Sequence, residues 1–394
     1  MIFREAVIED SSGSPFYPPS VGGIEVHVET LSRKLANAGH QVTVYTANVP
    51  KSHKRESIKG IDINRFHSWL GSFNNQFTPG LFFKLIGDRN YDVVHIHSHV
   101  FLANNMAALS KNFNRLPMVL TSHGAIPGYK SIKHTIEIIY NATAGKWTLK
   151  AMDKVIALAP SQADILARLG ARRKDIRIIP PGIELSQFHP DGDSREFRAM
   201  HGLENRKIIL FVGTLIPRKG VEYLIEAVKY VKSKPLLLLV GGEIPGFFGH
   251  QKFLEDRARE LGVDKDVRFL GHFTRDQLEP AYLAADLFAH PSFIEGLPIV
   301  IMEAMAYGKG IVATDIPGNC DAIKDGINGL LCRPGDAHDM AQKIDLLIED
   351  SELQHKLGAQ ARQDAILNYG WDSVLKKIMD VYTEVVRNRI KSQR

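Results

Sequence analysis

The stretch KIILFVGTLIPRKGVEYLIEAVKYVK, residues 207–232, holds a short apolar run, a turn flanked by glycines and an amphipathic pattern in direct succession. The apolar run at 207–213 has the length of one buried strand, and the segment that begins at Val221 repeats apolar residues at helical spacing. A strand followed by such a helix is the repeating unit of parallel sheets with crossover helices. This stretch therefore predicts an α/β fold.

Strands of the same kind recur on both sides of this stretch. Residues 178–194 between them are dense in Pro, Gly and Asp, as in a linker, and 394 residues exceed the size of a single core. We predict two doubly wound domains in series, residues 1–185 and 186–370, which bind ligands at the carboxyl ends of their strands. The predicted strands are 41–47, 92–98, 117–123, 154–160, 207–213, 235–241, 267–271, 287–292 and 310–315.

The two ends of the chain are less easily assigned. Residues 2–16 have the pattern of a poor first strand, whereas a helix is predicted from Ile24 to a C-cap at Gly39. A last amphipathic helix begins at Trp371, and its periodicity leaves open whether it packs on its own domain or crosses back to the first.

The charge of the chain is unevenly distributed. Residues 1–180 hold 22 Lys and Arg against 13 Asp and Glu, or +9, which leaves 27 against 31, or −4, for the remainder. The basic half is the candidate for anionic surfaces. Cys320 and Cys332 lack metal-type spacing, no secretory pattern opens the chain and no apolar run approaches the roughly 20 residues of a membrane helix. We therefore expect a cytoplasmic protein, and nucleic-acid binding is the weakest hypothesis because no recognised module carries the basic residues.

Candidate phosphate-binding residues follow two strands of the second half. Arg218 and Lys219 lie at the mouth of the helix that begins at Val221, where adjacent cations suit a phosphate or diphosphate. Taken alone, the pair fits a solvated charged turn equally well. Gly242, in VGGEIPG at 240–246, would allow a ligand to approach the backbone closely.

Two glutamates, Glu295 and Glu303, interrupt the apolar stretch FIEGLPIVIMEAMAYG at 293–308. Pro298 fits the first turn of a helix, so that Glu295 lies in the preceding loop and Glu303 within the helix. Free N–H groups at the helix start suit an anion, and ionised carboxylates accept hydrogen bonds from neighbouring sugar or ribose hydroxyls. The alternative is a helix cap and a solvated helix glutamate.

The first half offers a glycine pair and several histidines. Gly22 and Gly23 precede a predicted helix and would form a backbone cradle for phosphate. His95, His97 and His99 alternate along one strand in a pattern similar to a zinc ligand set. We expect no metal there, because no acidic or Cys ligand lies nearby in sequence. His123 ends another strand and is better placed to touch a substrate.

As a set, these segments resemble the retaining glycosyltransferases of family 4, which have a GT-B fold of two Rossmann-like domains facing across a cleft. The motifs that carry the resemblance are YPPSVGGIEVHVETLSRKLANAGHQVTVYTA, DVVHIHSH, TSHG, IPPGIELSQF, FVGTLIPRKG, FLGHF, HPSFIEGLPIVIMEAMAYG and DGINGLL, in the order of the family. The glutamate pair matches the E-x7-E motif of the family. The chain departs from the pattern at Gly242 and Glu243, where Asp-Gly is usual, and at Gly310, which replaces a proline.

The resemblance implies roles for single residues. Arg218 and Lys219 would neutralise the donor diphosphate, Glu303 would hold the ribose hydroxyls and Glu295 those of the transferred sugar. His123 would lie near the reacting carbon, and residues 371–394 would cross back onto the first domain. No metal and no cofactor are implied. The implied donor-binding residues are Gly22, Gly23, Arg218, Lys219, Gly242, Glu295, Gly296, Leu297, Pro298, Ile299 and Glu303.

The implied reaction is transfer of a hexose or N-acetylhexosamine from a nucleotide diphosphate sugar by front-face attack. A UDP-sugar is the first choice of donor and a GDP-sugar the second. The acceptor would be a hydroxyl of a lipid-linked, polysaccharide or small-molecule acceptor, in polysaccharide or glycolipid biosynthesis. A GT-B epimerase, a phosphorylase and a non-catalytic nucleotide-sugar-binding subunit are the alternatives.

Peripheral contact with an anionic membrane at its inner face is a further hypothesis from the residues. An ordinary helix with its apolar side on the sheet is the favoured interpretation of the same segment. The residues concerned are Lys130, Lys133, Lys146, Lys150 and Lys154 with Ile136, Ile139, Tyr140 and Trp147.

Overall fold

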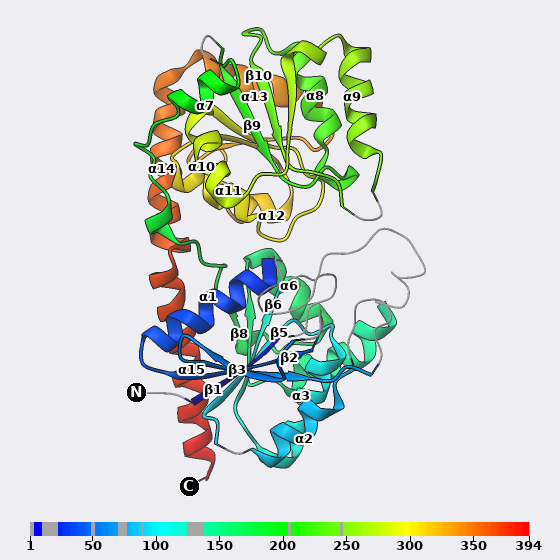
Figure 1. The fold of residues 1–394 in the computed structure, drawn as a ribbon, viewed down its shortest axis with the longest axis vertical. Coiled ribbons are helices and arrows are strands. Elements are labelled where there is room, and N and C mark those ends of the chain that lie inside the picture. Colours follow the sequence, from blue (N-terminus) through cyan, green and yellow to red (C-terminus); the bar gives the residue numbers. More distant parts are fainter. Residues whose placement is uncertain are drawn as a thin grey trace. The chain divides into compact units, whose positions relative to one another are not determined.

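The computed structural model describes residues 4–9, 23–48, 52–69, 77–88, 90–123, 138–203, 206–244 and 247–393. The chain forms two compact units (Figure 1). Unit 1 comprises Met1–Gly182 and Asp372–Arg394, and unit 2 comprises Ile183–Trp371. The unit boundary at Gly182 lies inside the predicted linker, and the last helix belongs to unit 1.

Unit 1 is built on one eight-stranded sheet in the order β3-β4-β2-β1-β5-β6-β7-β8. All neighbouring strands are parallel except β3 and β4, which form an antiparallel pair at one edge. The doubly wound prediction is therefore confirmed for this unit. The strands are β1 (Arg4–Glu9), β2 (Gln41–Ala47), β3 (Arg55–Ile58), β4 (Ile61–Phe66), β5 (Val93–His97), β6 (Met118–Ser122), β7 (Lys154–Ala157) and β8 (Ile176–Ile178).

The first strand corrects the sequence interpretation. Residues 2–16 looked like a poor strand, yet β1 lies inside the sheet and pairs with β2 on one side and β5 on the other. Pairing on both sides satisfies the backbone groups of β1, and strand formation depends on such neighbours more than on local propensity. The prediction of a weak strand was therefore wrong.

The helices of unit 1 follow its strands in sequence. Helix α1 starts at Gly23 and is followed by Gly39 at φ 88°, in agreement with the predicted C-cap. Helices α2 and α3 pack against each other. The helical segments are α1 (Gly23–Asn37), α2 (Pro79–Gly87), α3 (Leu102–Asn114), the π-helical turn η2 (Asn141–Gly145), α5 (Lys146–Ala151), α6 (Pro160–Leu169), η3 (Arg173–Asp175) and α15 (Trp371–Gln393).

Helix α15 is tied to the sheet of unit 1 by polar contacts far apart in sequence. The Tyr382 hydroxyl lies 2.7 Å from His95 Nδ1 on β5. Glu384 pairs with Lys154 at 2.8 Å and with Arg177 at 2.9 Å. These contacts and the buried apolar residues of the helix explain why the C-terminal segment belongs to unit 1.

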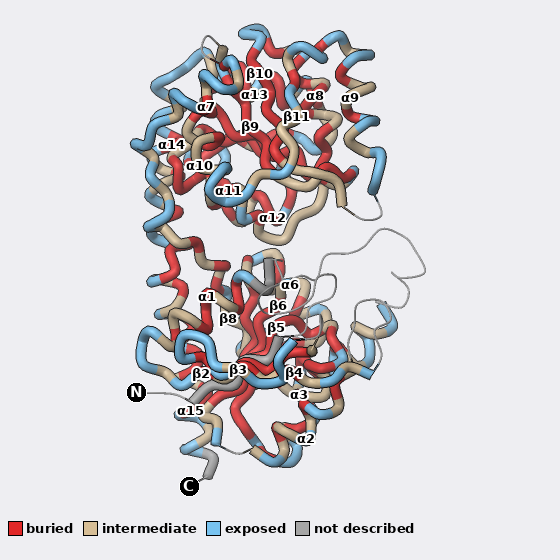
Figure 2. The backbone as a smooth tube through the Cα atoms, viewed as in Figure 1, coloured by how far each residue is buried: buried red, intermediate tan, exposed pale blue. Residues whose placement is uncertain are grey.

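Unit 2 contains a six-stranded, wholly parallel sheet in the order β11-β10-β9-β12-β13-β14. Its four central strands, β9, β10, β12 and β13, are buried along their whole length, which Figure 2 shows as continuous red along β9 and β10. The strands are β9 (Ile208–Val212), β10 (Leu236–Val240), β11 (Val267–Gly271), β12 (Leu287–His290), β13 (Gly310–Thr314) and β14 (Leu330–Cys332).

Helices lie on both faces of this second sheet, and the apolar clusters between helices and sheet form its two core layers (Figure 1). The helical segments are η4 (Leu185–Gln187), α7 (Arg195–Met200), η5 (Pro217–Lys219), α8 (Val221–Tyr230), α9 (His250–Leu261), η6 (Asp264–Asp266), α10 (Arg275–Ala284), α11 (Ile299–Ala306), α12 (Pro317–Cys320), α13 (Ala337–Glu349) and α14 (Ser351–Tyr369).

In each sheet there is one position at which the order of strand addition reverses, so that the chain continues on the other side of the first strand. In unit 1 this switch point lies between β1 and β5, and in unit 2 it lies between β9 and β12. Ligands of doubly wound sheets bind at the carboxyl ends of the strands at such a point. The residues that follow these four strands are therefore the candidates for a site. In the part of the chain that the structure describes, no helix has the length and apolar character needed to span a bilayer.

Candidate functional site

The switch point of unit 2 is formed by two loops, residues 213–220 after β9 and residues 291–296 after β12. The backbone N–H of Phe293 donates to the Arg218 carbonyl at 2.8 Å and ties the loops together. Gly220 has φ 63°, and a Cβ at this position would lie 2.3 Å from the Pro291 carbonyl oxygen. Only glycine fits there. The close approach brings the Arg218-Lys219 turn against the loop that carries Glu295.

Lys219 and Glu295 form a buried ion pair at this point. Lys219 Nζ lies 2.5 Å from Glu295 Oε1, and the two side chains are only 11% and 8% exposed. Arg218 Nη1 lies 3.6 Å from Glu295 Oε2 and donates to the Ile294 carbonyl, and its side chain is 32% exposed. The cluster of two cations and one carboxylate therefore carries a net charge of +1, with Arg218 as its more accessible cation.

Two further side chains, His290 and Ser292, bind the same carboxylate. Ser292 Oγ donates to Glu295 Oε1 at 2.7 Å, and His290 Nε2 lies 3.1 Å from that oxygen. Burial alone would raise the pKa of Glu295, but the hydrogen bond with His290 and the charge of Lys219 outweigh it, so that the pKa lies well below its ordinary value. Burial lowers the pKa of Lys219, and Glu295 opposes that change. At neutral pH Glu295 is an ionised acceptor.

The resemblance placed the two cations and Glu295 on one donor, and in the structure their side chains contact one another. The structure also adds His290, the last residue of β12, and Ser292 in the loop that follows, whose roles were not predicted. Oε1 of Glu295 accepts from three side chains, whereas Oε2 has only the longer Arg218 contact among the described residues. Oε2 is thus the atom on which a ligand hydroxyl can bind.

Gly318 packs closely against the backbone of Glu295 and Gly296, and a larger residue at this position tests that contact. A Cβ at Gly318 would lie 2.1 Å from the Gly296 carbonyl oxygen and 2.6 Å from that of Glu295. We expect Gly318→Ala to lower the free energy of unfolding by about 1–3 kcal/mol, as overpacking does. Gly296→Ala is the matched control, since a Cβ there meets nothing within 4 Å. Thermal unfolding checks both, and equal midpoints for the two variants would contradict the assigned contact.

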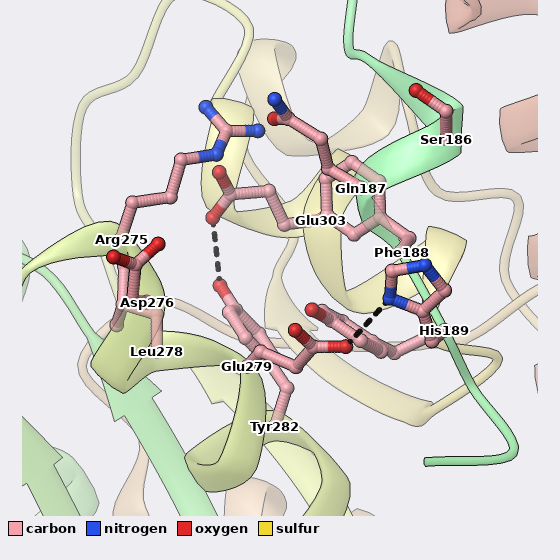
Figure 3. Close-up of a pocket in the computed structure, with 11 residues that line it drawn as sticks. Ser186, Gln187, Phe188, His189, Arg275, Asp276, Leu278, Glu279, Tyr282 and Glu303 are labelled. Carbon is pink, nitrogen blue, oxygen red and sulfur yellow. Dashed lines mark hydrogen bonds and ion pairs between the residues drawn. The ribbon is translucent and has the colours of Figure 1, made fainter.

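Glu303 lines a pocket of unit 2 with a volume of about 270 Å³ (Figure 3). The Tyr282 hydroxyl donates to Glu303 Oε2 at 3.1 Å, and the Arg275 guanidinium points toward the same carboxylate. Burial raises the pKa of Glu303, opposed by the Tyr282 hydrogen bond and the Arg275 charge. Phe188 and Tyr307, whose rings contact each other edge to face, form an apolar side of the pocket. The predicted alternative of a solvated helix glutamate does not hold for Glu303, which is half-buried and hydrogen-bonded to Tyr282.

The remaining predicted donor-binding residues of unit 2 lie in loops that follow its strands, apart from Ile299, which is the first residue of α11. The Gly242 carbonyl accepts from Leu215 N at 2.9 Å, which joins the loops after β10 and β9. Glu243, the departure from the family pattern, accepts from Gln251 N at 2.8 Å near the start of α9. Helix α11 begins at Ile299, with Pro298 as its N-cap residue and Leu297 packed against the core.

A histidine cluster occupies the switch point of unit 1. The rings of His95 and His97 on β5 lie 4.3 Å apart. His97 Nδ1 lies 2.9 Å from Nε2 of His123, which follows β6, and the His27 ring of α1 lies 5.0 Å from that of His123. Burial lowers the pKa of His27 to about 4 and of His95 to about 3, and it lowers the pKa of His97 and His123 well below the ordinary value. All four rings are therefore neutral at pH 7.

Of the three histidines that alternate along the strand, only His97 belongs to a group of described side chains whose ligand atoms lie close together. His99 lies beyond the end of β5, whereas ligand atoms of His27, His97 and His123 lie within 4.8 Å of one another. The three histidines with close ligand atoms therefore come from α1, from β5 and from the residue after β6, and not from one strand.

The other predicted residues of the first half of the chain are glycines and the residues of the membrane hypothesis. Gly23 is the first residue of α1, while Gly22, Lys130, Lys133 and Ile136 lie outside the described residues. The structure contradicts the placement of Lys154 among membrane-facing lysines. Lys154 is buried on β7 and pairs with Asp175 at 3.2 Å as well as with Glu384. Its charge compensates two carboxylates inside unit 1.

Comparisons with known proteins agree over both units. The model of glycosyl transferases group 1 matches residues 193–364, and that of glycosyltransferase family 4 matches residues 21–187. An uncharacterized glycosyltransferase of Methanocaldococcus jannaschii is 28% identical, with 93% of this chain and 95% of that protein covered. The D-inositol 3-phosphate glycosyltransferase of Salinispora arenicola is also 28% identical, with 95% and 90% covered. The structure of Anabaena HepE, solved with UDP and also with UDP-glucose, has a TM-score of 0.79 at 21% identity, over 97% of this chain and 100% of that one.

Proposed function

The chain belongs to the group 1 glycosyltransferases of family 4 and has their GT-B fold, and from this premise we propose a retaining sugar transfer. The donor is a nucleotide diphosphate sugar, with a UDP-linked hexose or N-acetylhexosamine first and a GDP-sugar second. The acceptor supplies a hydroxyl group. UDP as the first choice is supported by the UDP and UDP-glucose complexes of HepE.

The observation that carries the proposal is the cluster of Arg218, Lys219 and Glu295 at the switch point of unit 2. The cluster holds an excess positive charge in a mostly buried setting, where charge stabilisation is stronger than in water. A diphosphate matches that charge, and Arg218 is exposed enough to contact it. Glu295 keeps Lys219 in place and offers Oε2 to a hydroxyl of the transferred sugar.

The nucleoside is assigned to the pocket beside Glu303. An ionised carboxylate can accept from both hydroxyls of a ribose. The edge-to-face Phe188 and Tyr307 rings give the pocket an apolar side, while the Arg275 guanidinium adds hydrogen-bond donors near the carboxylate. Glu303 then fixes the ribose at one end of the diphosphate, and Glu295 contacts the sugar at the other.

In the proposed reaction, the bond from the sugar C1 to the diphosphate oxygen breaks while the acceptor oxygen bonds C1 on the same face. The departing phosphate oxygen takes the proton of the acceptor hydroxyl. Arg218 and Lys219 stabilise the negative charge that develops on the diphosphate, which is usually the largest single contribution to such a reaction. Neutral His123 contacts the transferred sugar and helps to align it.

The pH dependence of donor binding tests the role of Glu303. Because burial raises its pKa, protonation removes a hydrogen-bond acceptor at a higher pH than for an ordinary glutamate. The affinity for UDP-glucose is therefore expected to be full above that raised pKa and to fall as the pH decreases through it. Glu303→Gln should bind weakly at every pH, with a flatter profile. Calorimetric titrations check this, and parallel profiles for the two proteins would rule out the assignment.

We propose an acceptor that carries negative charge. The net charge of +9 in residues 1–180 supports this choice, as does the substrate named for the Salinispora relative, D-inositol 3-phosphate. A lipid-linked phosphate is an alternative of the same chemistry, together with peripheral contact of unit 1 with an anionic membrane. Incubation with D-inositol 3-phosphate and with phosphatidylinositol vesicles distinguishes a small-molecule acceptor from a lipid.

We further propose that no metal or cofactor takes part, since Arg218 and Lys219 supply the charge that a divalent metal would otherwise provide. The test is transfer from a panel of UDP- and GDP-sugars in excess EDTA, with the anomeric configuration of the product determined by proton NMR. An α-linked product from an α-linked donor is expected. An inverted product, or transfer that requires added metal, would reject the mechanism, and binding without transfer would favour a non-catalytic subunit.

A further inference from the structure

Helix α3 of unit 1 carries its large apolar side chains on the exposed side. Its buried residues are small or polar and include Ala103, Ala107 and Ala108. Leu109 is 40% and Phe113 58% exposed. A surface helix normally turns its large apolar residues toward the core. The exposed row at helical spacing comprises Leu102, Leu109 and Phe113, with the half-buried Met106 between them.

Polar contacts hold α3 in this orientation. Asn104 Nδ2 donates to the carbonyl oxygens of His97 and Ser98, each at 2.7 Å, and Asn114 donates to the Leu85 carbonyl at 2.7 Å. A rotation that buried Leu109 and Phe113 would break these buried hydrogen bonds and leave their carbonyls without partners. The exposure of the apolar row is thus part of the folded state.

The neighbouring helix α2 extends this apolar surface. The Phe82 ring lies 5.8 Å from that of Phe113 and 5.5 Å from that of Phe83, which is 69% exposed. We call the set Phe82, Phe83, Leu109 and Phe113 the α2–α3 patch. Contiguous exposed aromatic residues of this kind mark interaction surfaces in soluble domains.

A basic hollow adjoins the patch at the end of α3. Its volume is about 700 Å³, and it is lined by Lys111, Arg115, Lys154, Arg172 and Arg389 against the carboxylates of Asp153 and Asp175. Lys154 and Arg172 share Asp175, and Lys111 pairs with Asp153. Five cations against two carboxylates leave the lining with an excess charge of +3. Asn112, next to Phe113 in the chain, belongs to this lining.

We propose that the α2–α3 patch and the basic hollow together dock unit 1 on an anionic lipid bilayer. Phe83 and Phe113 enter the interface of the bilayer, and the hollow receives phosphate-bearing headgroups. Aromatic residues beside clustered Lys and Arg are the combination that binds such surfaces. Charge complementarity selects the membrane over a second copy of the chain, because pairing two patches would bring two basic hollows together. This inference deepens the membrane contact of the proposed function and rests on it.

The test uses the full chain without donor or acceptor, so that membrane binding and sugar transfer can fail independently. Sedimentation with vesicles of phosphatidylcholine, with and without phosphatidylglycerol, measures partitioning at low and high salt. Binding is expected only with phosphatidylglycerol and should weaken as salt screens the charges. Equal binding to both vesicles would contradict the role of the hollow, and no binding to either would overturn the proposal.

Matched variants locate the contact. The double variant Phe83→Ser/Phe113→Ser should lower partitioning at least about tenfold, as expected for two aromatic side chains removed from an apolar contact. Phe248→Ser, at a 75% exposed residue of unit 2, should leave it unchanged. Arg115→Glu should weaken binding, while Lys232→Glu on unit 2 should not. Unchanged binding of the double variant would overturn the proposal.

Analytical ultracentrifugation tests the alternative that the α2–α3 patch binds a second copy of the chain. The wild type and the double variant are expected to sediment as the same species. A dimer that the double variant converts to monomer would show that the patch pairs copies of the chain and would overturn membrane docking. Circular dichroism and the thermal unfolding midpoint verify that each variant is folded, which is expected because the changed side chains are largely exposed.

Discussion

Replacing Lys219 with methionine is expected to lower the rate of sugar transfer about 10²- to 10³-fold, the usual loss when one transition-state charge partner is removed. Methionine keeps the length of the side chain but cannot stabilise the departing diphosphate. The variant should also be less stable by about 3–5 kcal/mol, since the buried Glu295 carboxylate loses its closest cation. The rate under saturating donor and the free energy of unfolding are the two measurements.

The double variant Lys219→Met/Glu295→Gln separates the two effects. It removes both buried charges, and the carbonyl oxygen of the introduced amide, in the place of Oε1, can still accept from Ser292, so most of the lost stability should return. Transfer should stay low, because the cation is still missing. A double variant that transfers sugar at the wild-type rate would mean that Lys219 acts only in folding.

Unit 1 is expected to lose stability steeply below pH 6.5. Burial keeps five histidines neutral in the folded state: His27, His95, His97, His99 and His123. Their folded pKa values lie below the unfolded value of 6.5, so the unfolded chain binds more protons as the pH falls. Each histidine then costs about 1.4 kcal/mol at pH 5.5, and the stabilisation is fully present only above the unfolded pKa.

Summed over five such histidines, the loss of unfolding free energy over about two pH units approaches the whole stability of a typical domain. Hydrogen exchange followed by mass spectrometry reports the two units separately, and it should show unit 1 opening before unit 2. His95→Asn/His97→Asn should make the free energy of unfolding less dependent on pH. Equal acid sensitivity of the two units would contradict the assignment of neutral histidines.

The strands and the helix-rich connections could be predicted because buried parallel strands leave continuous apolar runs. Strand β2 begins at Gln41 and ends at Ala47 as predicted, and β11 coincides with residues 267–271. The short edge strands β3, β8 and β14 were not predicted, since three or four residues show no reliable period. Strand β1 was misjudged because its neighbours β2 and β5 are far away in sequence.

Several residues of the candidate site were predicted from the sequence, but the contacts between their side chains were not. Arg218, Lys219, Glu295 and Glu303 were identified from motifs, yet the ion pair of Lys219 with Glu295 joins residues 76 positions apart. The contact of His97 with His123 depends on the pairing of β5 with β6, which local pattern does not encode. The burial of Lys154 could not be predicted either. From the sequence it looked like a solvated cation, whereas it lies in a strand and pairs with two carboxylates.

The most direct test of the account compares the binding of UDP and UMP by calorimetry in excess EDTA. The two ligands differ in one phosphate, so the ratio of their affinities isolates the contribution of the Arg218, Lys219 and Glu295 cluster. The wild type should bind UDP at least about tenfold more tightly, as for one charge-assisted contact worth about 1.4 kcal/mol or more. This ratio should collapse in Lys219→Met/Glu295→Gln. An equal ratio in both proteins would contradict the assignment of this cluster as the diphosphate site.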